Sequence, residues 1–136
     1  MARRLLATVI GLLALFVAFV QTPSIAQQQQ QRQLRRIVPH GVETRVTWSS
    51  TWSVNADGTC TGAAIVPLTL ITPPKHGSVR FDVGDIRERN CPNSTRGAIV
   101  LYKPNPGFLG EDEFVFQRGG DFQTTAATVE VLVNVQ

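Results

Sequence analysis

The chain is poor in the residues that most catalytic and cofactor sites require. It holds two histidines, two cysteines, one tyrosine and one methionine in 136 residues. The methionine is Met1, inside a predicted export signal, so the His, Cys and Met ligand set of a copper protein is missing. No Cys-x-x-Cys pair, Gly-x-Ser-x-Gly elbow, phosphate loop or dinucleotide fingerprint occurs. We therefore expect no cofactor and no enzymatic activity.

Helical periodicity is absent after residue 26, and the one long apolar run lies at the N-terminus. Arg3 and Arg4 precede the uncharged residues 5–20, and Ser24 and Ala26 have the spacing that a signal peptidase accepts. A membrane span needs about 20 apolar residues, more than this run supplies. We expect a helical signal peptide over residues 1–26, cleavage after Ala26, and export to the periplasm or the medium. No stable membrane span is expected after cleavage.

Residues 27–36 are almost entirely glutamine and arginine, with Leu34 as the only apolar side chain. Such a segment cannot bury enough surface to offset the entropy lost on ordering. We predict a disordered linker. The alternative is an electrostatic tether, in which Arg32, Arg35 and Arg36 touch anionic lipid or polysaccharide.

The basic charge belongs to these N-terminal segments. The whole chain has a formal net charge of +3. Five of its 13 basic residues precede Ile37, which leaves eight against all 10 acidic residues and a domain near −2. A nucleic-acid-binding domain would need lysine and arginine clustered on the fold itself. We therefore expect no nucleic-acid partner.

Short alternating runs separated by turn residues fill residues 37–136, a length that suits one domain. Pro67 inside one run indicates an edge strand or a bulge. The strongest run is the last, where Val129, Val131, Val133 and Val135 share one face. About seven strands at this spacing predict an all-β antiparallel sandwich. The expected strands are residues 43–49, 51–54, 64–71, 78–83, 97–103, 113–117 and 125–135.

Cys60 and Cys91 are the only cysteines, and both lie among turn residues. An exported chain with a small, even cysteine count favours a disulfide over a reactive thiol. The bridge would close a loop of roughly 30 residues, which stabilises a chain by about 3–4 kcal/mol in the entropy model. The antibody pattern does not fit, because both tryptophans precede Cys60.

A turn between two strands carries the most distinctive pattern of the chain. Its members are Tyr102, Pro104, Gly107, Phe108, Gly110, Asp112, Phe114 and Phe116. Upstream, residues 74–79 read Pro-Lys-His-Gly-Ser-Val. Both patterns resemble bacterial Ig-like and cadherin-like repeats of secreted and surface proteins. The resemblance implies an Ig-like sandwich in an exported setting and supplies no catalytic residue. Phe116 stands where those repeats usually carry Tyr, the cysteine pair is not general to them, and this chain has one copy.

The same turn can be interpreted physically. Gly107 and Gly110 permit backbone angles closed to other residues, and Pro104 ends ladder pairing. Phe108 is expected to close one end of the core, and Asp112 to accept backbone N–H bonds. The alternative for Asp112 is calcium ligation with Glu111 and Glu113 beside it, although calcium wants six to eight oxygens from a compact set. We expect no metal, with Asp112 as the one weak calcium candidate.

Residues 84–97 are predicted to form a long surface loop pinned by Cys91. Arg87, Arg89 and Arg96 make this loop the candidate contact surface, since binding residues on a sandwich usually sit on loops held by rigid sheets. A purely solvated connection is the alternative reading.

From these observations we expect an exported, non-catalytic Ig-like module that serves cell-envelope structure or contacts an unidentified protein or glycan of the envelope. Two alternatives stay open at this point. One is a calcium-stabilised adhesion-type domain, and the other is an enzyme of unrecognised type.

Overall fold

The computed structural model describes residues 30–62, 64–119 and 126–136, and these residues form nine strands and no helix. The strands are β1 Gln30–Val38, β2 Thr44–Ser49, β3 Trp52–Val54, β4 Cys60–Gly62, β5 Leu68–Thr72, β6 Gly77–Ile86, β7 Thr95–Pro104, β8 Gly110–Arg118 and β9 Ala127–Val135. The prediction of an all-β fold is confirmed. The described residues offer no helix long and apolar enough to cross a membrane.

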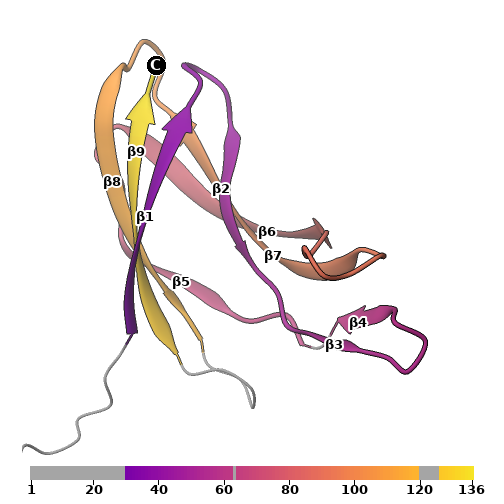
Figure 1. The fold of residues 1–136 in the computed structure, drawn as a ribbon. Helices are drawn as coiled ribbons and strands as arrows, with labels where there is room; N and C mark the ends of the chain where they lie inside the picture. Colours follow the sequence, from indigo (N-terminus) through magenta and orange to yellow (C-terminus); the bar gives the residue numbers. More distant parts are fainter. Residues whose placement is uncertain (1–29, 63, 120–125) are drawn as a thin grey trace, which may run out of the picture.

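The strands form two facing sheets and a small ribbon (Figure 1). One sheet has the order β1-β9-β8-β5 and the other the order β2-β7-β6. All pairings are antiparallel except that of β1 with β9. β3 and β4 pair only with each other and project from the body of the sandwich.

The core lies between the two sheets and follows the alternation of the sequence. In β9 the four predicted valines are buried, and in β7 Ala98, Val100 and Tyr102 are buried together. The central cluster of buried residues comprises Val38, Val46, Val100, Tyr102, Phe114, Phe116, Val129, Val131, Val133 and Val135. Burial of this apolar surface is the main favourable term in folding.

β1 corrects the predicted linker. Residues 30–36, expected to be disordered, pair in parallel with β9 in a register that continues from Gln30 opposite Ala127 to Val38 opposite Val135. Leu34 packs against the core, Val38 is fully buried, and Arg36 Nε donates to the Val46 carbonyl of β2 at 2.5 Å. Composition misled here because the ladder with β9, rather than apolar side chains, orders the segment. Residues 27–29 and the predicted signal peptide lie outside the described residues.

β5 has the features that Pro67 predicted. It follows this proline directly, it is the last strand of its sheet, and its register against β8 shifts between Leu70 and Thr72. The short strand β4 was not predicted, because three residues are too few to show alternation.

One buried carboxylate joins the two sheets at the end of the sandwich opposite the ribbon. Asp112 lies on the inner side of β8 and is only 6% exposed. Its Oδ2 accepts the Tyr102 hydroxyl of β7 at 2.9 Å, so the bond crosses from one sheet to the other. The rings of Tyr102 and Phe114 are parallel beside it, with centroids 6.0 Å apart. A buried charge of this kind is tolerated only when it is fully hydrogen-bonded.

The same carboxylate holds the connection from β5 to β6. Asp112 accepts the backbone N–H groups of Lys75 at 3.0 Å and His76 at 2.9 Å, and its Oδ1 also accepts its neighbour Glu113 N at 2.9 Å. Gly77 follows, where an added Cβ would lie 2.5 Å from the Tyr102 ring. The predicted Pro-Lys-His-Gly turn therefore presents two N–H donors and then lets the backbone approach Tyr102 closely.

The turn between β7 and β8 closes this end of the core. Gly107 and Gly110 have positive φ angles of 79° and 118°, as the sequence predicted. Phe108 packs against the core and stacks on His76, with ring centroids 4.3 Å apart. Asn105 N donates to the His76 carbonyl at 2.8 Å, which ties the two turns together.

This arrangement predicts an abnormal titration of Tyr102, the only tyrosine of the chain. Burial raises the pKa of Tyr102, and the hydrogen bond to the Asp112 carboxylate raises it further. A raised pKa in the folded state contributes stability below the ordinary value of about 10, and this stability is lost as the pH rises toward the folded value. We expect tyrosinate absorbance to appear well above pH 10 in the native protein and near pH 10 in denaturant. A native midpoint near 10 would contradict the buried bond, and Tyr102→Phe provides the blank.

Candidate binding surface at the disulfide-bonded end

The predicted site residues lie at opposite ends of the sandwich. Tyr102, Asp112 and their neighbours form the closed end described above. The cysteine pair and the loop with Arg87 and Arg89 lie at the other end, beside the projecting β3–β4 ribbon (Figure 1). The sequence treated these as separate features, and the structure keeps them separate.

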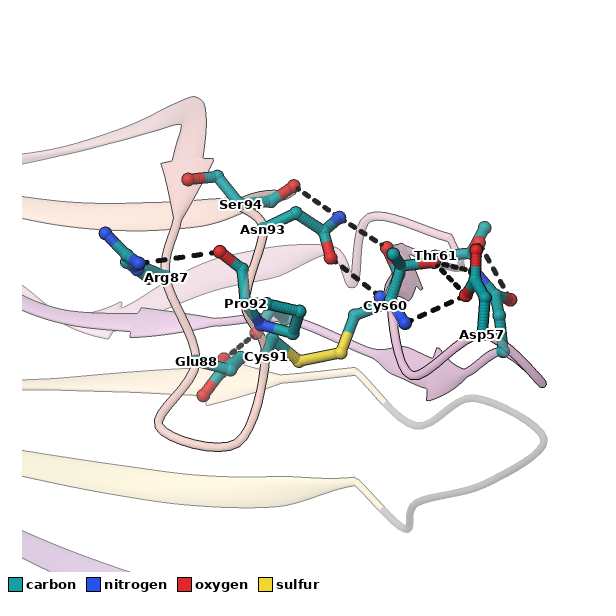
Figure 2. Close-up of a disulfide and its surroundings, with 12 residues drawn as sticks. Asp57, Cys60, Thr61, Arg87, Glu88, Cys91, Pro92, Asn93 and Ser94 are labelled. Atoms are coloured by element: carbon teal, nitrogen blue, oxygen red, sulfur yellow. Dashed lines mark hydrogen bonds between the residues drawn. A yellow bond between two sulfur atoms is a disulfide. The ribbon is translucent and has the colours of Figure 1, made fainter.

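The disulfide between Cys60 and Cys91 is present, with the two Cα atoms 5.6 Å apart. It joins β4 to the loop between β6 and β7 (Figure 2). Both half-cystines are only 5% exposed, although residues 53–58 of the ribbon are all exposed. Neither cysteine belongs to the central core cluster. The bridge therefore fixes a peripheral element that the core does not hold.

Asn93 gives the ribbon a second attachment. Its side-chain Oδ1 accepts Cys60 N and its Nδ2 donates to the Cys60 carbonyl, both at 2.7 Å (Figure 2). The amide thus pairs with both polar groups of one backbone residue, as a neighbouring strand would. Asn93 therefore has a structural role, which is to hold β4 against the loop between β6 and β7.

The tip of the ribbon is ordered by its own side chains. Asp57 Oδ1 accepts the Thr59 hydroxyl at 2.6 Å and Thr59 N at 2.9 Å. These two bonds lower the pKa of Asp57, and the bond from the Thr59 hydroxyl has the larger effect. Asn55 Nδ2 also donates to Thr59 and Thr61, each at 2.9 Å. The tip therefore has a defined shape despite its exposure.

The predicted long loop is shorter than residues 84–97. β6 continues to Ile86 and β7 begins at Thr95, with Gly84 paired to Gly97 and Asp85 to Arg96. The loop is thus residues 87–94, and Arg96 belongs to β7. The glycines gave no strand signal because they carry no side chain to alternate. Arg87 and Arg89 remain exposed in the loop, and Arg87 Nη2 lies 3.4 Å from the Pro92 carbonyl.

An aromatic side chain lies beside this loop that the sequence did not connect to it. Trp48 of β2 is on the outer face of the three-stranded sheet and is 45% exposed. Its Nε1 donates to Glu88 Oε1 at 3.4 Å, and the Ser50 hydroxyl donates to the same oxygen. The Arg45 guanidinium lies 5.4 Å from the ring centroid. Simple alternation would place Trp48 on the inner face, because it is two positions from the buried Val46. The register shift between Arg45 and Thr47 places it on the outer face instead, and this shift leaves no signal in the sequence.

The other sheet carries a shallow groove of about 740 Å³ on its outer face at the closed end. A row of paired residues crosses the groove, from Arg35 of β1 through Leu132 of β9 to Glu113 of β8. Opposite charges at its two sides and an apolar centre give it no clear preference for one class of ligand.

Asp112 offers hydrogen-bond acceptors to protein donors rather than to a cation. Both carboxylate oxygens are engaged by N–H or O–H groups. Calcium is bound by a compact set of oxygen atoms, whereas the groups that surround this carboxylate are hydrogen-bond donors. Within residues 30–62, 64–119 and 126–136, no cluster of three or more His, Cys, Asp or Glu side chains could hold a metal ion.

Comparison with known proteins gives no relative. The chain matches no protein-family model, and neither a curated protein nor a solved structure shows a significant match. Its β-sandwich architecture is therefore known from its own strands and sheets.

Removing the disulfide is predicted to loosen the ribbon while the core remains folded. The bridge spans 31 positions, so Cys60→Ser with Cys91→Ser should lower the free energy of unfolding by about 3–4 kcal/mol. Amide hydrogen exchange should accelerate in residues 52–62 much more than in β7, β8 and β9. Asn93→Ala, which keeps the disulfide, should give a smaller change at the same residues. Unchanged exchange in the ribbon would contradict this role for the bridge.

Proposed function

We propose that this chain is an exported, non-catalytic module with an Ig-like sandwich, which binds a protein or glycan of the cell envelope through its disulfide-bonded end. We call this end the stapled surface and define it by residues 52–62 and 87–94 together with Trp48. The observation that carries the proposal is the order of an exposed protrusion: a disulfide, the Asn93 pairing and the tip bonds hold a ribbon outside the core.

The free-energy cost of ordering the exposed ribbon suggests that its order serves a function. A two-stranded ribbon alone is marginally stable in water, and each ordered residue costs about 1–2 kcal/mol of backbone entropy. Residues 53–58 bury little surface in return. A rigid surface loses less entropy on binding than a mobile one, so preorganisation favours affinity for a partner. Loops held by a rigid scaffold are common binding sites for the same reason.

The Ig-like assignment is supported by the role of its motif residues. Tyr102 and Asp112, which carry the resemblance, form a hydrogen bond that joins the two sheets, and Gly77 of the same motif lets the backbone approach the Tyr102 ring. The strand orders β1-β9-β8-β5 and β2-β7-β6 suit such a sandwich. The motif therefore has a physical role in this chain that matches its proposed family.

Export is supported by two features. A disulfide persists in oxidising compartments and is rare in the cytosol. The predicted cleavage after Ala26 would also leave β1 whole, because β1 begins at Gln30. Export to the periplasm or the medium is therefore part of the proposal.

A binding role also suits the chemistry of the stapled surface better than catalysis does. Its cysteines are joined in the bridge, and Glu88 is hydrogen-bonded to Trp48 and Ser50. Neither histidine of the chain lies there, since His76 stacks on Phe108 at the other end and His40 lies in the turn between β1 and β2. Exposed arginines and a half-exposed tryptophan are residue types enriched in binding hot spots.

The proposal predicts saturable binding to envelopes of the organism that encodes the chain. Labelled, oxidised protein should cosediment with isolated envelopes, and Trp48→Ala with Arg87→Ala and Arg89→Ala should weaken this binding at least about tenfold, the effect of about 1.4 kcal/mol. Lys103→Ala with Leu109→Ala alters exposed residues outside the stapled surface and should bind like the parent chain. Equal binding by the triple variant and the parent would refute the proposed surface.

A further inference from the structure

β6 is an edge strand without the usual protection against pairing with another chain. Proteins protect the edges of their sheets with clustered charge, proline, bulges or short strands. The other three edge strands have such features, namely three arginines in β1, a register shift in β2, and in β5 a preceding proline and a register shift. β6 has ten residues without proline or lysine, and its register with β7 is continuous. Within the described residues, β6 pairs with no strand besides β7.

The apolar core is incompletely covered along this edge. The inner residues of β6 and their partners in β7 are Val79 opposite Tyr102, Phe81 opposite Val100 and Val83 opposite Ala98. The three β7 residues are at most 4% exposed, whereas those of β6 are only partly covered and Val83 is 40% exposed. β5 diverges from β6 beyond the connection between them (Figure 1). A further strand beside β6 would therefore bury apolar surface, which is favourable.

The outer side of β6 carries one charge of each sign close to its middle. Arg80 and Asp82 are two positions apart, and Arg80 Nη1 lies 3.0 Å from Asp82 Oδ2. Arg80 also donates to Glu43 through Nε and Nη2. These bonds use three of the five N–H groups of a guanidinium, so Arg80 can serve another carboxylate. The side chains of Arg80 and Asp82 are each 53% exposed.

One register of two antiparallel β6 strands suits both faces of the sheet. It is centred on Phe81 and pairs almost the whole strand with its equivalent. On the outer face, Arg80 lies opposite Asp82 of the second copy, and the symmetry repeats this pair. On the inner face, Val79 lies opposite Val83 of the second copy, and Phe81 lies opposite its own equivalent. Moving the centre by one residue would place Arg80 or Asp82 opposite itself, and like charges in that position are destabilising.

The other charges near this edge do not oppose the register. Asp85 lies opposite Arg96 of β7 and would face Gly77 of the second copy. Lys103 lies on β7 opposite Ser78, one strand away from the edge. The register therefore creates no like-charged pair at the edge.

We propose that the chain forms a twofold dimer in which the β6 edges of two copies pair antiparallel. The two three-stranded sheets then continue into one sheet, with the order β2-β7-β6-β6-β7-β2. Backbone groups at the free edge gain hydrogen-bond partners, as in other cases of strand addition. The assembly closes at two chains, because each copy uses its β6 edge once.

The dimer has a consequence for the stapled surface, although it does not depend on that surface. β6 runs toward the loop of residues 87–94, which belongs to the stapled surface. Antiparallel pairing therefore places the two stapled surfaces at opposite ends of the dimer. If each binds as proposed above, one dimer joins two partner molecules.

The first test measures the oxidised, unaltered protein by sedimentation equilibrium. The weight-average mass should rise from one chain to two between about 1 μM and about 1 mM, the range of weak association. Amide hydrogen exchange at low and high concentration then locates the interface. Exchange in β6 should slow several fold at high concentration, whereas exchange in β1, β5 and the stapled surface should not change.

A charge exchange tests the register itself. Arg80→Glu and Asp82→Arg each create two like-charged pairs in the dimer, so each should weaken dimerisation at least about tenfold. When the two variants are mixed in equal amounts, every such pair has opposite charges, and a heterodimer should form about as tightly as the parent dimer. Arg35→Glu reverses an exposed charge on β1, an edge strand of the other sheet, and should dimerise like the parent.

Several results would overturn the inference. These are a single chain at every concentration, growth beyond two chains, and concentration-dependent protection outside β6. The same holds if both charge variants are folded by circular dichroism and their mixture forms no heterodimer. If either variant fails to fold, the exchange pattern of the unaltered chain decides. The triple variant that tests envelope binding should dimerise normally, so this inference and the proposed function can fail separately.

Discussion

The buried carboxylate of Asp112 is the interaction on which the sandwich depends. It accepts hydrogen bonds from one hydroxyl of the facing sheet and from two backbone N–H groups of the connection between the sheets. It therefore joins β8 to β7 and to the connection between β5 and β6. Each of these donors would be costly if buried without an acceptor. The ion pair of Arg80 with Glu43 is comparably short at 2.7 Å, yet both side chains are substantially exposed and solvent screens their attraction. The buried Asp112 bonds therefore contribute more to stability than the exposed ion pair, although the distances are similar.

The two ends of the sandwich are stabilised by different kinds of interaction. Apolar packing, Gly77 and the Asp112 bonds fix the closed end, where the termini of β7 and β8 meet in a tight turn. The other end is built from exposed segments that the core does not hold, and it relies on a covalent bridge and on Asn93. Because the disulfide and Asn93 lie outside the core cluster, we expect changes in the stapled surface to leave the two sheets folded. Such separation suits a scaffold that presents a binding surface.

The sequence predicted the strands in which burial alternates, since the valines of β9 and the phenylalanines of β8 face one core. It failed for β1, whose polar residues are ordered by parallel pairing with β9, and for the ends of β6 and β7, where paired glycines carry no side chains. The cysteine bridge was predicted from the even cysteine count together with the export that the sequence predicts. The contact of Trp48 with Glu88 could not be predicted, because the two residues are 40 positions apart and meet only through the register of β2, β7 and β6. Local sequence patterns predict which side chains are buried, but they do not predict which residues of neighbouring strands lie opposite each other.

The most direct measurement is the free energy of unfolding, by denaturant titration, of Asp112→Ala beside Glu113→Ala. Glu113 is the exposed neighbour of Asp112 in β8 and has the same kind of charged group. We predict that Asp112→Ala loses about 3 kcal/mol or more, because the buried Tyr102 hydroxyl and two part-buried backbone N–H groups lose their acceptor. Glu113→Ala should change stability by less than about 0.5 kcal/mol. Similar small effects for both variants would contradict the central role of this carboxylate.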